Sequence, residues 1–104
     1  MKKMKFPWGE LILVGSTNEF SVCVDIINPG SEADSRDAYL KKGVAMYYVI
    51  EGNGLLAGKP IKKGDFKKIV AGQNMHLKNN SRKKLKLIGI YLPPYDDANI
   101  GYKG

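Results

Sequence analysis

Short clusters of glycine, proline, asparagine and aspartate recur along the whole chain, and they constrain its fold more than any other feature. Such clusters mark turns, because glycine and asparagine tolerate a positive φ and proline fixes φ. The segments between them are rich in β-branched and aromatic residues, which favour strands. The predicted strands are 11–14, 20–27, 45–51, 54–57, 66–70, 75–78 and 84–92. Many short strands with regular turns predict an all-β sandwich or barrel.

The spacing of apolar residues is that of strands and not of helices. Nowhere do apolar residues recur with helical spacing over the length of a helix, so helix is expected to be nearly absent. In the segment 20–27, alternation puts Cys23 and Asp25 on one face and Val22 and Val24 on the other. Mixed polarity of this kind suits a jelly-roll barrel. The segment 30–43 is the longest without strand character, and we expect it to be a loop that rims a site.

The length of the chain fits one small domain. Its 104 residues have room for a single domain, 1–104, with one hydrophobic core. The longest apolar run is too short to cross a membrane, and no apolar signal segment follows the basic N-terminal residues. We therefore expect a cytoplasmic protein without membrane contact.

The chain is basic, with a formal net charge of +7. Most of its lysine clusters flank predicted turns, and no nucleic-acid-binding motif or stacking platform accompanies them. They are either solvated turn charges or an anion-binding face. We expect solvated charges, with at most weak and nonspecific binding of nucleic acid.

Two residues invite a catalytic interpretation. Cys23 is the only cysteine, so neither an internal disulfide nor a cysteine zinc cluster can form. It is either a nucleophile, which would need a nearby histidine and a pocket, or a small buried hydrophobic residue. His76 is the only histidine. It is either a general base, because its unperturbed pKa lies near neutrality, or an ordinary strand residue.

Several segments resemble the motifs of the cupin family. The run 46–54 resembles the strand and glycine turn that end the first cupin motif, and 64–79 keeps the spacing of the second. The Asn-Pro-Gly at 28–30 resembles the start of the first motif, and 85–94 resembles the closing strand. The resemblance covers about 20–94 and implies a cupin-like jelly-roll barrel, or double-stranded β-helix, with very little helix.

The two flanks carry a further resemblance. Phe-Pro-Trp-Gly at 6–9 and the segment 93–100 are similar to the flanks of cupin modules in phosphomannose isomerase-like enzymes.

The resemblance also implies where metal ligands would lie. Metal-binding cupins supply two histidines and a glutamate from the first motif and one more histidine from the second. In this chain the histidine pair falls within 38–41, the glutamate on Ala45 and the last histidine on Met75. These residues lack the donors that iron, manganese, nickel or zinc require. We expect no metal and no other cofactor.

Other donors lie close to these positions in the sequence. His76 comes one residue after Met75, and the period of a strand would turn it away from the lumen. The carboxylates of Glu32, Asp34 and Asp37 could reach in from the preceding loop, but no register places two of them at ligand positions.

A lumen without metal is either an apolar pocket for a small ligand or is filled by side chains. The residues expected to line it are Ala38, Leu40, Ala45, Tyr47, Met75 and Asn79.

Three functions follow from a metal-free cupin. The first, which we favour, is a noncatalytic module that binds a sugar or another small molecule. The second is a metal-independent isomerase or epimerase that uses His76, or a tyrosine such as Tyr48, as acid or base. The third is an engineered scaffold whose metal site was removed.

A homodimer is also expected. A barrel of this kind leaves an apolar outer face or an edge strand in need of cover, and the strand at 10–15 is a candidate to pair across the interface.

Overall fold

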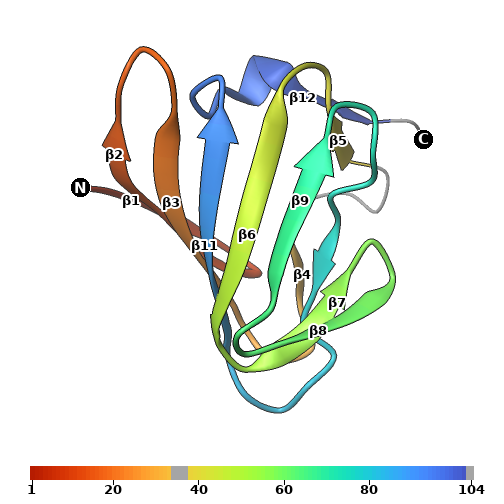
Figure 1. Cartoon of the computed structure of the whole chain (residues 1–104). Coiled ribbons are helices and arrows are strands. Elements are labelled where there is room, and N and C mark those ends of the chain that lie inside the picture. Colours follow the sequence, from red (N-terminus) through yellow and green to blue (C-terminus); the bar gives the residue numbers. More distant parts are fainter. Residues whose placement is uncertain (34–37, 103–104) are drawn as a thin grey trace.

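The computed structural model describes residues 1–33 and 38–102, and its regular structure is almost entirely β-strand (Figure 1). The strands are β1 (Lys2–Phe6), β2 (Gly9–Ser16), β3 (Ser21–Ile27), β4 (Glu32–Ala33), β5 (Ala38–Leu40), β6 (Val44–Glu51), β7 (Asn53–Leu56), β8 (Lys59–Lys62), β9 (Phe66–Val70), β10 (Leu77–Lys78), β11 (Leu85–Leu92) and β12 (Ile100–Tyr102). Within the described residues the one helical element is a 3₁₀ turn, η1 (Asp97–Asn99). The expected all-β fold is confirmed. None of the described helical structure is long and apolar enough to cross a membrane.

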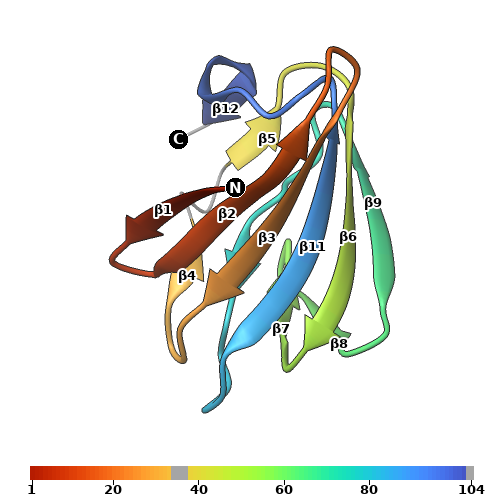
Figure 2. The ribbon, with the colours of Figure 1, turned by 90° about the vertical axis from the view of Figure 1, so that its left-hand side faces the viewer.

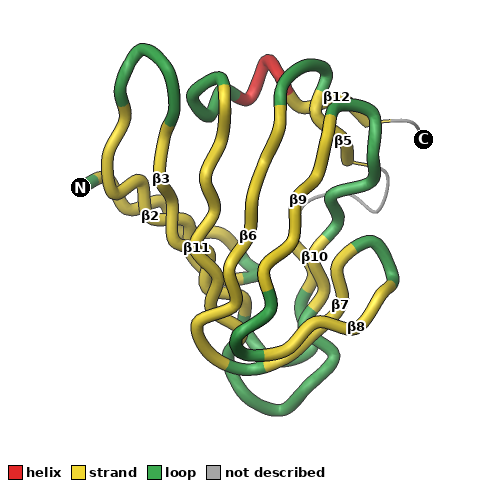
Figure 3. The backbone as a smooth tube through the Cα atoms, viewed as in Figure 1, coloured by secondary structure: helices red, strands yellow, loops and turns green. Residues whose placement is uncertain are grey.

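Two sheets form the walls of the barrel. The larger has the strand order β1-β2-β3-β11-β6-β9, the smaller has β4-β10-β7-β8, and β5 pairs with β12 at one end. Figure 2 shows the strands of the larger sheet one after another, from β1 and β2 to β9. The connecting loops gather at the two ends of the barrel (Figure 3). This is the predicted double-stranded β-helix.

The predicted strands agree with β2, β3, β6, β7, β9, β10 and β11 to within two residues at each end. The segment 30–43 differs, because β4 and β5 lie within it, on either side of residues outside the described part of the chain. The prediction of a loop without strands was therefore wrong. These strands have two and three residues, too few to show a periodicity, and pairing with β10 and β12 defines them.

The core lies between the two sheets and is built by alternation along the long strands. In β3, Ser21, Cys23, Asp25 and Ile27 are buried, and the residues between them are half-buried. β6 and β11 alternate in the same way. The inward face of β3 is therefore its more polar face.

Both edges of the strand expected to pair across a dimer interface are already paired with strands of the same chain. β2 is hydrogen-bonded to β1 along one edge and to β3 along the other. It offers no free edge to a partner, so that part of the dimer prediction is corrected. The outer strands of the larger sheet are β1 and β9.

Candidate functional site

The lumen of the barrel is nearly filled by side chains. It holds a cavity of about 30 Å³, room on the order of one water molecule. Both sheets, the N-terminal turn and the C-terminal segment contribute to its wall. The lining residues are Phe6, Trp8, Leu11, Asp25, Ala33, Tyr47, Met75, Leu77, Tyr91, Tyr95 and Ile100.

Three polar side chains meet at this cavity, and we call them the lumenal polar cluster: Asp25 from β3, Tyr47 from β6 and Tyr91 from β11. The hydroxyl oxygens of Tyr47 and Tyr91 are hydrogen-bonded at 3.1 Å, and their rings meet edge to face at 87°. Asp25 is only 5% exposed. A carboxyl group and two phenols thus share a buried space.

Gly89 makes room for the two phenol rings. It lies on the inward side of β11 and pairs with Tyr47 across the sheet. A Cβ atom at Gly89 would lie 3.2 Å from Cε2 of Tyr91 and 3.3 Å from Cε1 of Tyr47. Since these distances are shorter than ordinary carbon contacts, the missing side chain allows both rings to point into the lumen.

Burial raises the pKa of two groups beside Asp25, the phenol of Tyr91 and the thiol of Cys23. It raises the pKa of Tyr91 well above the usual value, and the nearby Tyr47 and Asp25 add to the effect. The phenol of Tyr91 therefore keeps its proton at neutral pH. Burial also raises the pKa of Cys23 to about 12, helped by Asp25 and opposed by a hydrogen bond with Ser21. Cys23 is thus a protonated, buried thiol at neutral pH, which does not suit a nucleophile.

Aromatic side chains form the rim of the cavity. The Tyr95 ring packs against that of Tyr91 with a centroid distance of 5.2 Å, and the Tyr95 backbone N–H donates to Ser21 Oγ at 2.6 Å. On the N-terminal turn, Phe6 and Trp8 stack with a centroid distance of 4.9 Å. These rings offer apolar surfaces beside the polar cluster.

The positions of the cupin metal ligands do not suit a metal. Ala38, Leu40, Ala45 and Met75 are all buried, and the thioether of Met75 is the one donor that their side chains offer. In residues 1–33 and 38–102, no group of three or more His, Cys, Asp or Glu side chains is placed to hold a metal ion. The carboxylates of Asp34 and Asp37 lie outside these ranges.

His76 lies beside the lumen and does not line its cavity. It is 9% exposed, and its Nε2 lies 3.4 Å from Oε1 of Glu32. Its backbone N–H donates to Asn74 Oδ1 at 2.9 Å. Tyr48 projects from the opposite side of the larger sheet and is 43% exposed. The structure does not bring these two predicted acid–base residues together.

The side chain of Asn79 stabilises a loop through hydrogen bonds. Its Nδ2 donates to the carbonyl oxygens of Ile27 at 2.9 Å and Lys83 at 2.6 Å. Its Oδ1 accepts from the backbone N–H and the hydroxyl of Ser81 at 3.0 and 2.7 Å. These bonds join the end of β3 to the loop between β10 and β11. Of the residues expected in a ligand pocket, Tyr47 and Met75 line the lumenal cavity.

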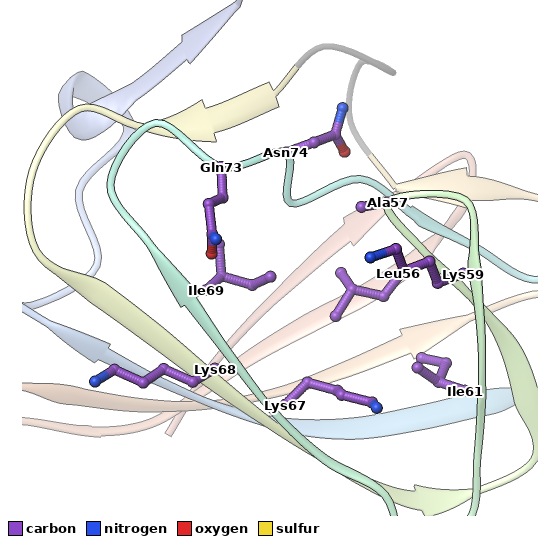
Figure 4. Close-up of a pocket in the computed structure, with 9 residues that line it drawn as sticks. All are labelled: Leu56, Ala57, Lys59, Ile61, Lys67, Lys68, Ile69, Gln73 and Asn74. Atoms are coloured by element: carbon purple, nitrogen blue, oxygen red, sulfur yellow. The ribbon is translucent and has the colours of Figure 1, made fainter.

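A second concavity of about 420 Å³ lies at the edge of the barrel, between β9 and the β7–β8 hairpin. Leu56, Ile61 and Ile69 give it an apolar floor, and Lys59 and Lys67 extend over that floor, whereas Lys68 points away (Figure 4). The residues lining this concavity include no acidic side chain. The groove is open to solvent and has the charge to attract an anion.

The sequence did not identify Asp25 or the aromatic side chains at the rim of the cavity as site residues. Alternation puts Asp25 on the same face as Cys23, but both faces of β3 have mixed polarity, so periodicity does not tell which is inward. Tyr95 follows two prolines beyond the last predicted strand, where no period applies.

No family model matches the sequence, and no curated protein matches it. Similar solved structures exist. An uncharacterized conserved protein with a double-stranded beta-helix domain from Klebsiella pneumoniae aligns with a TM-score of 0.76 and 19% identity, over 99% of this chain and 85% of that one. Streptomyces PAC13 with uridine, a substituted form, aligns with a TM-score of 0.77 and 14% identity, over 99% and 84%. An RmlC-like cupin protein from Desulfovibrio desulfuricans gives 0.67 and 17%, over 82% of each chain.

The chain thus has the fold of the cupins, as the sequence motifs indicated. At these identities the likeness is one of fold. The similarity of the flanks to phosphomannose isomerase-like enzymes stays a prediction.

Proposed function

We propose that this chain is a binding module for a sugar or nucleoside, which it holds in the barrel lumen through the hydroxyl groups of the ligand. The observation that supports it is the lumenal polar cluster, in which Asp25, Tyr47 and Tyr91 face one cavity. Burial of polar groups costs free energy. A site that places three of them around an otherwise apolar cavity has the composition of a ligand pocket.

The chemistry of the cluster suits a polyhydroxylated ring. A carboxylate accepts hydrogen bonds from neighbouring hydroxyl groups, and a protonated phenol donates to a ring or carbonyl oxygen. The rings of Trp8 and Tyr95 offer flat surfaces for the apolar face of such a ligand. The Streptomyces protein of similar fold contains uridine, which has both a sugar and a flat base.

Ligand entry requires the lumen to open, because the cavity of about 30 Å³ is far smaller than a sugar ring. The N-terminal turn is the part of the wall that we expect to move. β1 is mostly exposed and pairs with β2 alone, so few contacts hold it. Outward displacement of Phe6 and Trp8 would enlarge the cavity beside the cluster.

Trp8 is the only tryptophan, so its fluorescence reports directly on this site. The experiment titrates the full chain with uridine, D-ribose and uracil separately. We expect a saturable change with uridine and a rise in melting temperature of roughly 10 °C at a ligand concentration about 100 times Kd.

Asp25→Asn should weaken binding at least about tenfold, since a charged acceptor is lost while the shape is kept. Asp65→Asn is the matched control, because Asp65 lies in the turn between β8 and β9 and outside the lumenal wall. The proposal fails if none of the three probes gives a saturable change, or if Asp25→Asn binds as tightly as the wild type.

A metal-independent isomerase or epimerase is the second candidate. It is favoured by the raised pKa of Tyr91, which keeps a proton donor beside the Asp25 carboxylate. Asp25 would remove the proton next to a carbonyl group, and Tyr91 would donate a hydrogen bond to the developing enolate oxygen. In this scheme Asp25 and Tyr91 take the roles predicted for His76 and Tyr48. Incubation with D-ribulose in deuterium oxide tests it: NMR should find deuterium on carbon with the wild type and not with Asp25→Asn.

A further inference from the structure

The groove between β9 and the β7–β8 hairpin exists because two edge strands stay apart. β9 is the last strand of the larger sheet and β8 is the last strand of the smaller one, and no described strand pairs with both. The hairpin turns through Ala57 and Gly58, whose φ angles of 52° and 79° suit a two-residue hairpin turn. The hairpin therefore forms one wall of the groove, and β9 forms the other (Figure 4).

The floor of the groove is apolar. Leu56 on β7, Ile61 on β8 and Ile69 on β9 supply it, and all three belong to the hydrophobic core. The hydrocarbon stems of Lys59 and Lys67 extend over these side chains (Figure 4). Both lysines are exposed, so their flexible stems can swing aside and leave the floor to the apolar part of a ligand.

Two positive charges reach this floor from opposite walls. Lys59 comes from β8 and Lys67 from β9. Among the described residues, neither ammonium group forms an ion pair. The carboxylate of Asp65, just before β9, accepts from the backbone N–H of Lys62 at 2.9 Å and does not line the groove. The positive charge of the groove is thus uncompensated and attracts an anion.

Gln73 adds a hydrogen-bonding group to the same groove. Its Oε1 accepts from the backbone N–H of Val70 at 2.9 Å, and its own backbone N–H donates to the carbonyl oxygen of Val70 at 3.1 Å. These two bonds hold the amide close to Ile69 (Figure 4). The amide nitrogen of Gln73 therefore supplies N–H donors in addition to the two ammonium groups.

The combination of charge and apolar surface defines the kind of ligand. A volume of about 420 Å³ lies within the range of small-molecule pockets, about 300–1,000 Å³. We propose that the groove binds an amphipathic monocarboxylate, whose carboxylate pairs with Lys59 and Lys67 and whose hydrocarbon chain covers the apolar floor. This site is separate from the lumen, because the two share no lining residue.

Three probes separate the contributions of charge and chain. Hexanoate has both, acetate has the carboxylate alone, and hexan-1-ol has the chain alone. Each is titrated into the ¹⁵N-labelled full chain at constant pH and ionic strength, and binding is followed by NMR. Hexanoate should give saturable amide shifts at Leu56, Ile61 and Ile69, with a dissociation constant on the order of 1 mM. Acetate and hexan-1-ol should bind at least about fivefold more weakly. The fluorescence of Trp8 should stay unchanged, because Trp8 lines the lumen and not the groove.

Lysine variants test the charges. The double variant Lys59→Gln with Lys67→Gln should weaken hexanoate binding at least about fivefold. Lys68→Gln is the matched control, because it makes the same change on β9 at a lysine that points away from the groove (Figure 4). Its dissociation constant should stay within about twofold of the wild type. The amide spectrum of each variant confirms its fold.

Four results would each overturn the proposal. The first is the absence of saturable shifts up to about 20 mM hexanoate. The second is binding of acetate or hexan-1-ol that is as tight as that of hexanoate. The third is shifts confined to the lumenal wall. The fourth is an equal loss of affinity in Lys68→Gln and in the double variant.

Discussion

Replacement of Asn79 by alanine should destabilise the fold strongly, although the sequence pointed to Asn79 as a pocket residue. The side chain is fully buried and makes hydrogen bonds to Ile27, Lys83 and Ser81. Ile27 is also fully buried, so its carbonyl oxygen would lose a partner where water does not replace it. The groups on Ser81 and Lys83 lie nearer to solvent.

The magnitude follows from these bonds. An unsatisfied buried carbonyl costs about 1–3 kcal/mol, and each bond that water partly replaces costs about 0.5 kcal/mol. The sum is about 3 kcal/mol, which for a domain of about 100 residues lowers the melting temperature by about 15 °C.

Urea denaturation compares Asn79→Ala with Asn80→Ala, since Asn80 is exposed and should lose less than about 0.5 kcal/mol. A loss below about 1 kcal/mol for Asn79→Ala would show that these hydrogen bonds contribute little to stability. If that variant keeps its stability and loses the uridine response, Asn79 is a ligand residue.

Three further predictions concern the lumen. Cys23 should react slowly with a disulfide reagent, because its pKa is raised to about 12 in the folded chain. At pH 8 we expect labelling to be at least about 10³ times slower in the folded chain than in the denatured chain. Equally fast labelling of the two would contradict this prediction. The free energy of unfolding should fall as the pH rises above about 9. The reason is that Cys23 and Tyr91 have raised pKa values in the folded chain, so the unfolded chain releases their protons at lower pH. Urea midpoints that stay constant from pH 8 to pH 10 would contradict this prediction. Gly89→Ala should cost about 1–3 kcal/mol by crowding the phenol rings, and a more stable variant would argue against that packing.

The sequence predicted the strands correctly where they are long. Turn residues set the ends of β3, β6 and β11, and the β-branched runs between them define the barrel. β1 and β8 were missed because they are rich in lysine or carry proline, as edge strands often do. The pairs of β4 and β5 lie far away in the sequence, so only tertiary structure defines those strands.

The site was harder to predict, because hydrophobicity does not mark the inward face of β3. Val22 and Val24 look like core residues, yet they lie on the outer face, and Cys23 and Asp25 point inward. An apolar outer face removes the contrast on which period-two reasoning depends. Tyr47 lies on the buried side of β6, but the hydrogen bond that joins Tyr47 to Tyr91 comes from strand pairing that a single sequence does not reveal.

A crystal structure of the protein grown with saturating uridine would show whether the lumen binds a small ligand. We expect ligand density in the lumen, with a ligand hydroxyl about 2.5–3.2 Å from a carboxyl oxygen of Asp25 and the Trp8 ring displaced outward. Density in the groove between Lys59 and Lys67, with Trp8 still closing an unchanged lumen, would contradict this expectation.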